Sequence, residues 1–576
     1  MNKRLLLIAL AIAVLSLASF AVFAQGDVAR EDTVIFDYDR TIADPGNFNP
    51  FTADGRNNKG NGAHQAMWEP LFILNYETGN IDPWLGLSME SNETLDVWTL
   101  VLRDGVMWSD GEAFNADDVV YTINMLLTDG AELPGDEGIR ASVASVEKID
   151  DLTVQFNLQA PNPRFQVDFF SVRSTNSVLI MPEHIWAGED PVTFTFYAED
   201  GSMPIGTGPY TLTSAETNRW VWDRNDDWWG VAAGFNDLPE PLRLIWLSVS
   251  TEDNRVQLIS NNETDAANNV SLAAFEAIQA RNPNVIAWEP QLPYSWSDPC
   301  PRQLDFNTTV APWDNPNMRQ ALSLIIDRQE IIDFAYEGTT IPSRTMFVEY
   351  GSMDPFISAV VDAGYGEAVN ADVATAQSLI EAEGYTLNNA GFYELDGEEL
   401  SVEILVNNAS TEYTGTVEII VEQLIAAGVD AFARQVDNGT FWGSAAPESD
   451  YEIAYGWLAC GSVNEPFATL ARYGTEGRFN NTGLWSGDGF EAYSAIVAEI
   501  GTLSLDDPQI PDLVAEAYSF IDAETPIIPL VQATKLLPFN TTYWEGWPTS
   551  ENNYNHPAFW WNHTHQIIHN LTKAEG

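Results

Sequence analysis

The spacing of apolar residues changes about halfway along the chain. Before residue 300, apolar and polar residues alternate in short runs such as 95–102 and 154–158, which predicts strands joined by tight turns. One clear helix is expected after Asn115, because Asn115 and Asp118 have the spacing of a capping box and an apolar stripe follows them. This part of the chain therefore predicts hairpins and one helix.

After residue 300, apolar residues recur at helical spacing between short strands. Asn315 begins a predicted helix that ends near Gly338. Residues 400–407 and 429–436 have the pattern of strands on either side of a helix over 417–427. Two strands joined through a helix predict a βαβ unit with parallel strands. The fold class is therefore expected to be α/β.

The N-terminus predicts export. Lys3 and Arg4 precede an apolar run over residues 5–23 that closes on small residues, so residues 1–24 read as a cleavable signal peptide. No cysteine stands directly after this cleavage site, which excludes the lipid anchor of bacterial lipoproteins. We expect a periplasmic or otherwise extracytoplasmic protein that is not held to a membrane.

Chain length and net charge restrict the number of lobes and the possible partners. The chain has 576 residues, which favours two or three lobes. Its 84 acidic and 25 basic residues give a net charge of -59, and this excludes nucleic acid and anionic membrane as partners. The acidic surface fits a soluble exported protein or one adapted to salt. Neither interpretation identifies a ligand.

Two cysteines, Cys300 and Cys460, stand in a chain that is predicted to enter an oxidising compartment. A disulfide between them would stabilise the fold by at most about 5 kcal/mol on the chain-entropy model. The alternative is a pair of buried thiols that pack as small apolar groups.

Six segments together resemble the family 5 extracellular solute-binding proteins, which are the peptide-type substrate-binding components of ABC importers. They occur in the family's order along the chain: EPLFILNYETGNIDPWLG (69–86), LRDGVMWSDGEAFNADDVVYTI (102–123), GTGPY (206–210), RNDDWWG (224–230), LDFNTT (304–309) and NMRQALSLIIDRQEII (317–332). The resemblance implies a binding protein and not an enzyme.

The resemblance also implies a two-lobed periplasmic-binding-protein fold of the large peptide-binding type, which closes on its ligand. The expected divisions are lobe one over 25–299 with an inserted subdomain near 72–200, lobe two over 300–528, a C-terminal return to lobe one over 529–576, and hinge strands at 304–309 and 525–532. The implied partners are a small ligand and the permease subunits of an ABC transporter. We expect a monomer without a cofactor.

One departure from the family pattern bears on the ligand. Peptide-binding relatives place an aspartate after a Gly-Trp pair to bind the ligand's ammonium group, but here GWLACGSVNEP (456–466) has Cys460, Gly461 and Ser462 near that place. Glu465 replaces the aspartate only if the loop presents it differently. A buried ammonium would thus lose a bond worth roughly 1.5–3 kcal/mol. We expect a neutral ligand, and the PWLG and PCPRQLDFNTT segments resemble the subgroup that binds β-linked oligosaccharides.

Tryptophan and amide side chains are the candidate ligand contacts, because flat rings suit the apolar faces of sugars and amides bind hydroxyl groups. The resemblance places five tryptophans at the cleft or its rim, and Gln65, Asn307 and Asn464 are the amide candidates beside them. The tryptophans are Trp68, Trp296, Trp442, Trp457 and Trp485. For any single tryptophan, packing in the core is the alternative.

Three other functions remain as alternatives. A peptide-binding protein of the same transporter class is the first. A secreted glycoside hydrolase would need two carboxylates about 5–10 Å apart in the cleft, and no pair in the sequence is singled out for that role. A nickel or haem carrier would use histidines of the tail such as His563 and His565, for which surface or terminal packing is the simpler interpretation.

Overall fold

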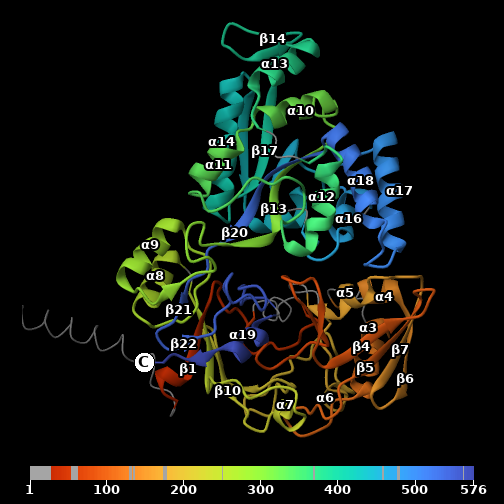
Figure 1. Ribbon diagram of the computed structural model, residues 1–576, viewed down its shortest axis with the longest axis vertical. Helices are drawn as coiled ribbons and strands as arrows, with labels where there is room; N and C mark the ends of the chain where they lie inside the picture. Colours follow the sequence, from red (N-terminus) through yellow and green to blue (C-terminus); the bar gives the residue numbers. More distant parts are fainter. Residues whose placement is uncertain are drawn as a thin grey trace, which may run out of the picture.

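The computed structural model describes residues 28–52, 62–128, 133, 137–172, 178–249, 251–366, 370–456, 460–475, 480–561 and 563–575. The predicted signal peptide lies outside these residues. Two strands, β13 (Trp296–Phe306) and β20 (Ile527–Lys535), run side by side between the two halves of the molecule (Figure 1). We call the half built from residues before β13 and after β20 lobe one, and the half between these strands lobe two. None of the described helices is long and apolar enough to cross a membrane.

Lobe one is built on a four-stranded sheet whose first strand pairs in parallel with its neighbour. In order across the sheet, its strands are β1 (Thr33–Tyr38), β11 (Arg243–Ser248), β10 (Arg219–Arg224) and β9 (Tyr210–Glu216). Aromatic side chains fill its core, and Trp220, Trp222 and Trp246 are fully buried. Beside this sheet stand α7 (Trp229–Ala232), α8 (Glu252–Ser260), α9 (Leu272–Arg281) and the pair β12 (Val285–Ile286) and β21 (Phe539–Asn540).

A second antiparallel sheet follows in the region predicted as the inserted subdomain. Its strands are β4 (Gly86–Ser91), β5 (Val97–Leu102), β7 (Thr153–Leu158) and β6 (Val143–Asp150), and its helices are α3 (Ala116–Thr128), α4 (Glu137–Ser142), α5 (Phe165–Phe169) and α6 (Glu183–Trp186). A three-stranded sheet of β3 (Ile81–Pro83), β2 (Phe72–Leu74) and β8 (Ser171–Val172) adjoins it. The capping box at α3 is confirmed, because Asn115 accepts a bond from the Asp117 amide and Asp118 accepts one from the Asn115 amide.

Lobe two holds a five-stranded mixed sheet to which both connecting strands belong. Its order is β18 (Asp430–Val436), β17 (Ser401–Asn407), β19 (Ile453–Gly456), β13 and β20. The predicted βαβ unit is confirmed, because β17 and β18 pair in parallel and α14 (Thr411–Ala427) joins them. This helix begins earlier than predicted, since the Ser410 side chain caps it by accepting a bond from the Glu412 amide.

The remaining elements of lobe two are mostly helices. They are α10 (Pro316–Ile325), α11 (Arg328–Ala335), η4 (Gly351–Met353), α12 (Asp354–Asp362), α13 (Val373–Ala382), α15 (Asn438–Thr440), η5 (Phe441–Ala445), α16 (Phe467–Gly474), α17 (Asp488–Thr502) and α18 (Ile510–Glu524), with a small sheet of β14 (Thr386–Leu387), β15 (Tyr393–Leu395) and β16 (Glu398–Glu399).

The single helix predicted between Asn315 and Gly338 is wrong, because the structure divides it into α10 and α11. Ile326 is extended, and the Asp327 side chain accepts bonds from the amides of Gln329 and Glu330. By capping these amides, Asp327 stabilises the start of a second helix at Arg328. This start competes with continuation of the first helix.

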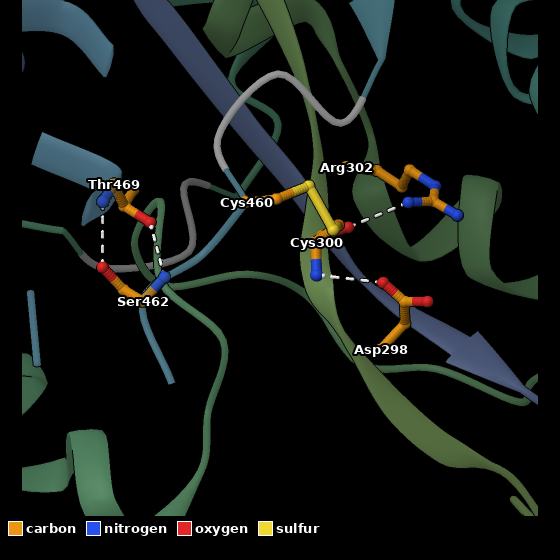
Figure 2. Close-up of a disulfide and its surroundings, with 6 residues drawn as sticks. All are labelled: Asp298, Cys300, Arg302, Cys460, Ser462 and Thr469. Carbon is orange, nitrogen blue, oxygen red and sulfur yellow. Dashed lines mark hydrogen bonds between the residues drawn. A yellow bond between two sulfur atoms is a disulfide. The ribbon is translucent and has the colours of Figure 1, made fainter. Parts of the chain in front are cut away.

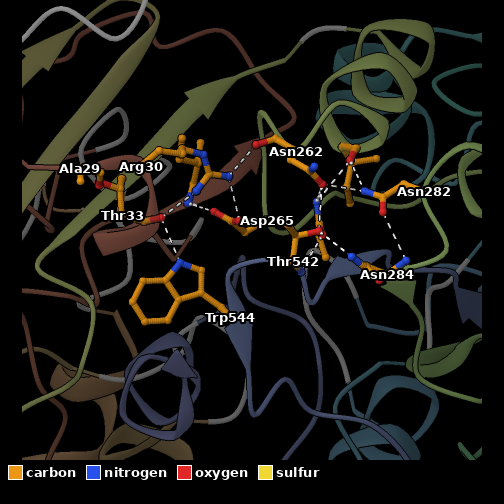
Figure 3. Close-up of polar contacts among 12 residues, drawn as sticks. Ala29, Arg30, Thr33, Asn262, Asp265, Asn282, Asn284, Thr542 and Trp544 are labelled. Carbon is orange, nitrogen blue, oxygen red and sulfur yellow. Dashed lines mark hydrogen bonds and ion pairs between the residues drawn. The ribbon is translucent and has the colours of Figure 1, made fainter. Parts of the chain in front are cut away.

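The C-terminal tail returns to lobe one through β21, β22 (Trp544–Glu545), α19 (Thr564–Asn570) and β23 (Thr572–Lys573). Asn262 is the central residue of this junction: its side-chain oxygen accepts bonds from Asn282 and from Thr542 of the tail, while its carbonyl accepts one from Arg30 (Figure 3). Trp544 donates its indole N–H to the Thr33 carbonyl (Figure 3). The tail is therefore tied to the first strand and to the loop after α8.

The tail histidines pack inside lobe one. His563 and His565 are buried, and His565 lies edge-on to Trp84 with 4.9 Å between ring centroids. Burial keeps the pKa of His565 well below its usual range, so that its ring is neutral. This placement agrees with terminal packing and corrects the surface alternative.

Candidate functional site

A cavity with an empty volume of about 500 Å³ opens where the two lobes meet. Lobe one and the first residues of β13 provide most of its wall, and Glu349 and Tyr350 come from lobe two. The full lining is Tyr76, Glu77, Trp288, Trp296, Ser297, Glu349, Tyr350, Asn553 and His556. Segments far apart in the sequence therefore form one site.

The aromatic side chains that line this cavity pack against one another. Trp296 stacks on the ring of His556 at 5.3 Å between centroids and on that of Tyr350 at 6.4 Å. Burial keeps the pKa of His556 well below its usual range, which leaves this ring uncharged. Among the described residues, the indole N–H groups of Trp288 and Trp296 donate to no acceptor. They remain available to a ligand.

The charged groups of the cavity are carboxylates. Glu77 accepts a bond of 2.6 Å from the Asn553 amide, and Glu349 forms a bidentate pair with Arg344, with both bonds 3.0 Å long. No lysine or arginine is among the described residues that line it. The cavity thus combines flat apolar faces with two donors and strong acceptors.

A second cavity with an empty volume of about 540 Å³ lies beside the first. Trp296 of the first cavity is the direct cross-strand partner of Lys535, which lines the second. The lining of the second cavity is Asp39, Arg40, Arg255, Asn268, Asn269, Asp298, Lys535 and Trp560. Unlike the first cavity, it carries cations as well as carboxylates.

Cys300 and Cys460 form a disulfide, which confirms the predicted pairing over the alternative of two thiols (Figure 2). The bridge ties the loop that begins at Cys460 to strand β13. Asp298 accepts a bond from the Cys300 amide, and Arg302 donates to the Cys300 carbonyl. Cys460 is thereby covalently fixed to β13, two residues from Asp298 of the second cavity.

Of the described side chains that were predicted to contact ligand, only Trp296 lines the first cavity. Trp68 packs within the core of lobe one, parallel to Phe196 at 6.4 Å, and Gln65 is buried near it. Trp485 packs in the core of lobe two, where it donates to Glu524. The structure therefore does not bring these three side chains to the cavity.

The other predicted contacts lie in lobe two. Asn307 uses its side-chain amide within lobe two, donating to the Ser449 carbonyl and accepting from the Thr309 hydroxyl. Trp442 is partly buried in η5, and Asn464 donates across the lobes to the Gly79 carbonyl at 3.2 Å. Trp457 lies outside the described residues.

Sequence reasoning missed Tyr76, Trp288 and Tyr350. Trp288 and Trp296 flank the loop that leads into β13, and two tryptophans just before a predicted hinge strand are a signal that was present in the sequence. Glu465, considered as a substitute for the missing aspartate, pairs instead with Arg164 at 2.9 Å. Glu465 is therefore not free to bind an ammonium group.

Two lobes that meet around a lined cavity define a ligand-binding protein of the periplasmic-binding class. The sequence profile of bacterial extracellular solute-binding proteins, family 5, matches residues 80–481, and the chain belongs to this family. It is accordingly a solute-binding protein of the kind that serves ABC importers.

Curated relatives are similar over most of their length. The nickel-binding periplasmic protein of Escherichia coli is 26% identical over 380 residues, which cover 64% of this chain and 65% of that protein. The glutathione-binding protein of Salmonella typhimurium is 25% identical over 453 residues, which cover 75% and 77%. The named ligands differ widely within the family.

Solved structures share the fold. The mannohexaose-bound periplasmic oligopeptide-binding protein of Thermotoga maritima matches with a TM-score of 0.75 at 20% identity, over 96% of this chain and 100% of that one. The oligopeptide-binding protein AppA of Bacillus subtilis, in complex with a nonapeptide, matches with a TM-score of 0.68 at 16% identity, over 94% and 99%.

Proposed function

We propose that the protein captures a neutral, β-linked oligosaccharide between its lobes and delivers it to the permease of an ABC importer. The proposal includes export through the signal peptide over residues 1–24 and a mature protein that carries no lipid. The single observation that carries the choice of ligand is the first cavity, with its aromatic walls, free indole donors and carboxylate acceptors.

Each part of this cavity matches a part of a sugar. Tyr76, Trp288, Trp296 and Tyr350 line the cavity, and aromatic rings of this kind pack against the C–H faces of pyranose rings. The two indole N–H groups suit sugar oxygens, and the carboxylate of Glu77 accepts bonds from hydroxyl groups.

Two further observations support a neutral ligand. Cys460 is engaged in the disulfide and Glu465 in the pair with Arg164, so neither takes the role of the ammonium-binding aspartate. The Thermotoga maritima protein, which shares this fold, was solved bound to mannohexaose. Trp442, Trp457 and Asn464 stay proposed contacts of a longer ligand.

A peptide is the second candidate, and the charges of the two cavities favour it. Glu77 at one end suits an ammonium group, while Arg40 and Lys535 in the neighbouring cavity suit a carboxylate. Relatives and fold neighbours named for glutathione and for oligopeptides agree with this reading.

A thermal-shift panel separates the candidates. Cello-, xylo- and manno-oligosaccharides are compared with di- and oligopeptides, glutathione and nickel–histidine, and we expect stabilisation by one of the oligosaccharide series alone. Stabilisation by peptides alone would overturn the proposal. An assay for reducing sugar is run on the same samples, because release of sugar would indicate a hydrolase instead.

Two tryptophan variants locate the site. Trp288→Ala removes an aromatic wall and a donor from the cavity, so we expect it to weaken oligosaccharide binding by about tenfold to a hundredfold. Trp108→Ala, which removes a buried tryptophan of lobe one that lies outside the cavity lining, is the matched control. Equal loss in both variants would contradict the placement of the site in the first cavity.

A further inference from the structure

Away from both cavities, one side chain of lobe one is held by groups of lobe two. Arg164 precedes α5 and its side chain is 2% exposed. Its Nε donates to Glu465 at 2.9 Å, its Nη1 donates to the Gly501 carbonyl at 3.1 Å, and its guanidinium lies 4.5 Å from the ring centroid of Phe467. Figure 1 shows α5 directly below α16 and α17. The guanidinium therefore bridges the lobes.

Each partner of this pair is fixed within its own lobe. The Glu465 carboxylate also accepts bonds from the amides of Phe467 and Ala468, which caps α16. The backbone of Arg164 is positioned by its bond to the Asn162 side chain. Because both groups are held before they meet, their pairing costs little additional side-chain entropy.

The pair forms when the lobes are in contact (closed) and is broken when they separate (open). When the lobes separate, both charges return to water and neither is left unsatisfied. When the lobes meet, both are buried, and removing one partner leaves the other without a counter-charge in a desolvated site. The bond from Asn464 to the Gly79 carbonyl is a second contact of the same kind. Loss of Arg164 alone therefore disfavours the closed arrangement specifically.

We propose that Arg164 and Glu465 form a clasp that favours lobe closure and so sets ligand affinity from outside the cavity. Because both groups of the clasp belong to the protein, the clasp favours closure even when no ligand is bound. A ligand that binds the closed form gains apparent affinity in proportion to the closed population. Arg164 is thus a positioning residue for ligand binding. The effect of the clasp does not depend on the chemical class of the ligand.

Single-molecule energy transfer between the lobes tests the clasp without a ligand. Dyes are attached at Ile149→Cys in lobe one and Phe432→Cys in lobe two, where both native side chains are exposed. The parent protein is expected to show a closed population, and Arg164→Met is expected to reduce the closed-to-open ratio by roughly a hundredfold. The same distance distribution in both proteins would overturn the proposal, as would a parent with no closed population.

Two further variants separate closure from folding. Arg302→Met breaks a buried pair with Glu412 inside lobe two, at 2.7 Å, and is expected to lower stability without changing the distance between the lobes. Arg164→Met with Glu465→Gln removes both charges, and we expect a closed population between those of Arg164→Met and the parent, because no buried charge is left unpaired but the attraction between the lobes is lost. A double variant as closed as the parent would show that the pair does not favour closure and would overturn the proposal. Failure to find a sugar ligand would leave all these outcomes unchanged.

Discussion

The two lobes share an α/β architecture but are stabilised by different chemistry. Only four of the twenty tryptophans and none of the six histidines lie between residues 300 and 528, whereas both cysteines do. Lobe one packs large rings, including buried neutral imidazoles, around its sheets. Lobe two packs mainly aliphatic side chains and carries the disulfide. The difference indicates that acid lowers the stability of lobe one, and that reduction of the disulfide lowers the stability of lobe two.

Removal of the disulfide has the largest expected effect. Replacing Cys300 and Cys460 by serine opens a loop that spans 160 residues, which lowers the stability of lobe two by at most about 5 kcal/mol. Differential scanning calorimetry is the measurement, and the transition of lobe two is expected to move while that of lobe one stays. Equal shifts of the two transition temperatures would show that the lobes unfold as one unit. That result would contradict the proposed difference between the lobes.

Acid has the next largest effect, through histidines such as His64. Both ring nitrogens of His64 lack a hydrogen-bond partner among the described residues, and burial lowers its pKa to about 3. Because the unfolded chain binds a proton near pH 6.5 and the folded chain does not, this group's contribution to stability falls as pH drops below 6.5.

His64→Phe removes this titration. Relative to the parent, the variant should gain about 2 kcal/mol between pH 7 and pH 5, which follows from about 1.4 kcal/mol per pH unit below the unfolded pKa. Denaturant unfolding followed by tryptophan fluorescence reports mainly on lobe one. A parallel pH dependence in variant and parent would mean that His64 is not the titrating group.

Loss of a helix cap in lobe two has the smallest expected effect. Asp327→Ala removes the side chain that accepts bonds from Gln329 and Glu330, which costs about 1 kcal/mol. Hydrogen exchange should show faster opening at these two amides and no change in lobe one. Unchanged exchange would mean that Asp327 does not determine where α11 begins.

Much of the local structure could be predicted from the sequence, because it depends on neighbouring residues. The capping box at Asn115 and the βαβ unit are set by side chains within a few positions of the backbone they bind. The division at Ile326 was missed because an apolar stripe runs on through it, while the competing cap depends on one aspartate. Helical spacing alone does not reveal such a competition.

The site was harder to predict, because a tryptophan looks the same in a sequence whether it faces a core or a cavity. Trp68 and Trp485 are packed in cores, while Trp288 and Trp296 line the site. Tyr76 and Tyr350 reach it from segments more than 270 positions apart, and only tertiary structure unites them. The disulfide was predictable because the chain offers only one possible pair.

Calorimetric titration tests the central claim most directly. The protein is titrated with the oligosaccharide that stabilises it most in the panel and, separately, with an oligopeptide. We predict saturable binding of the oligosaccharide, strong weakening of that binding by Trp288→Ala, and no heat of binding with the peptide. Saturable binding of the peptide, with none of the oligosaccharide, would contradict the account.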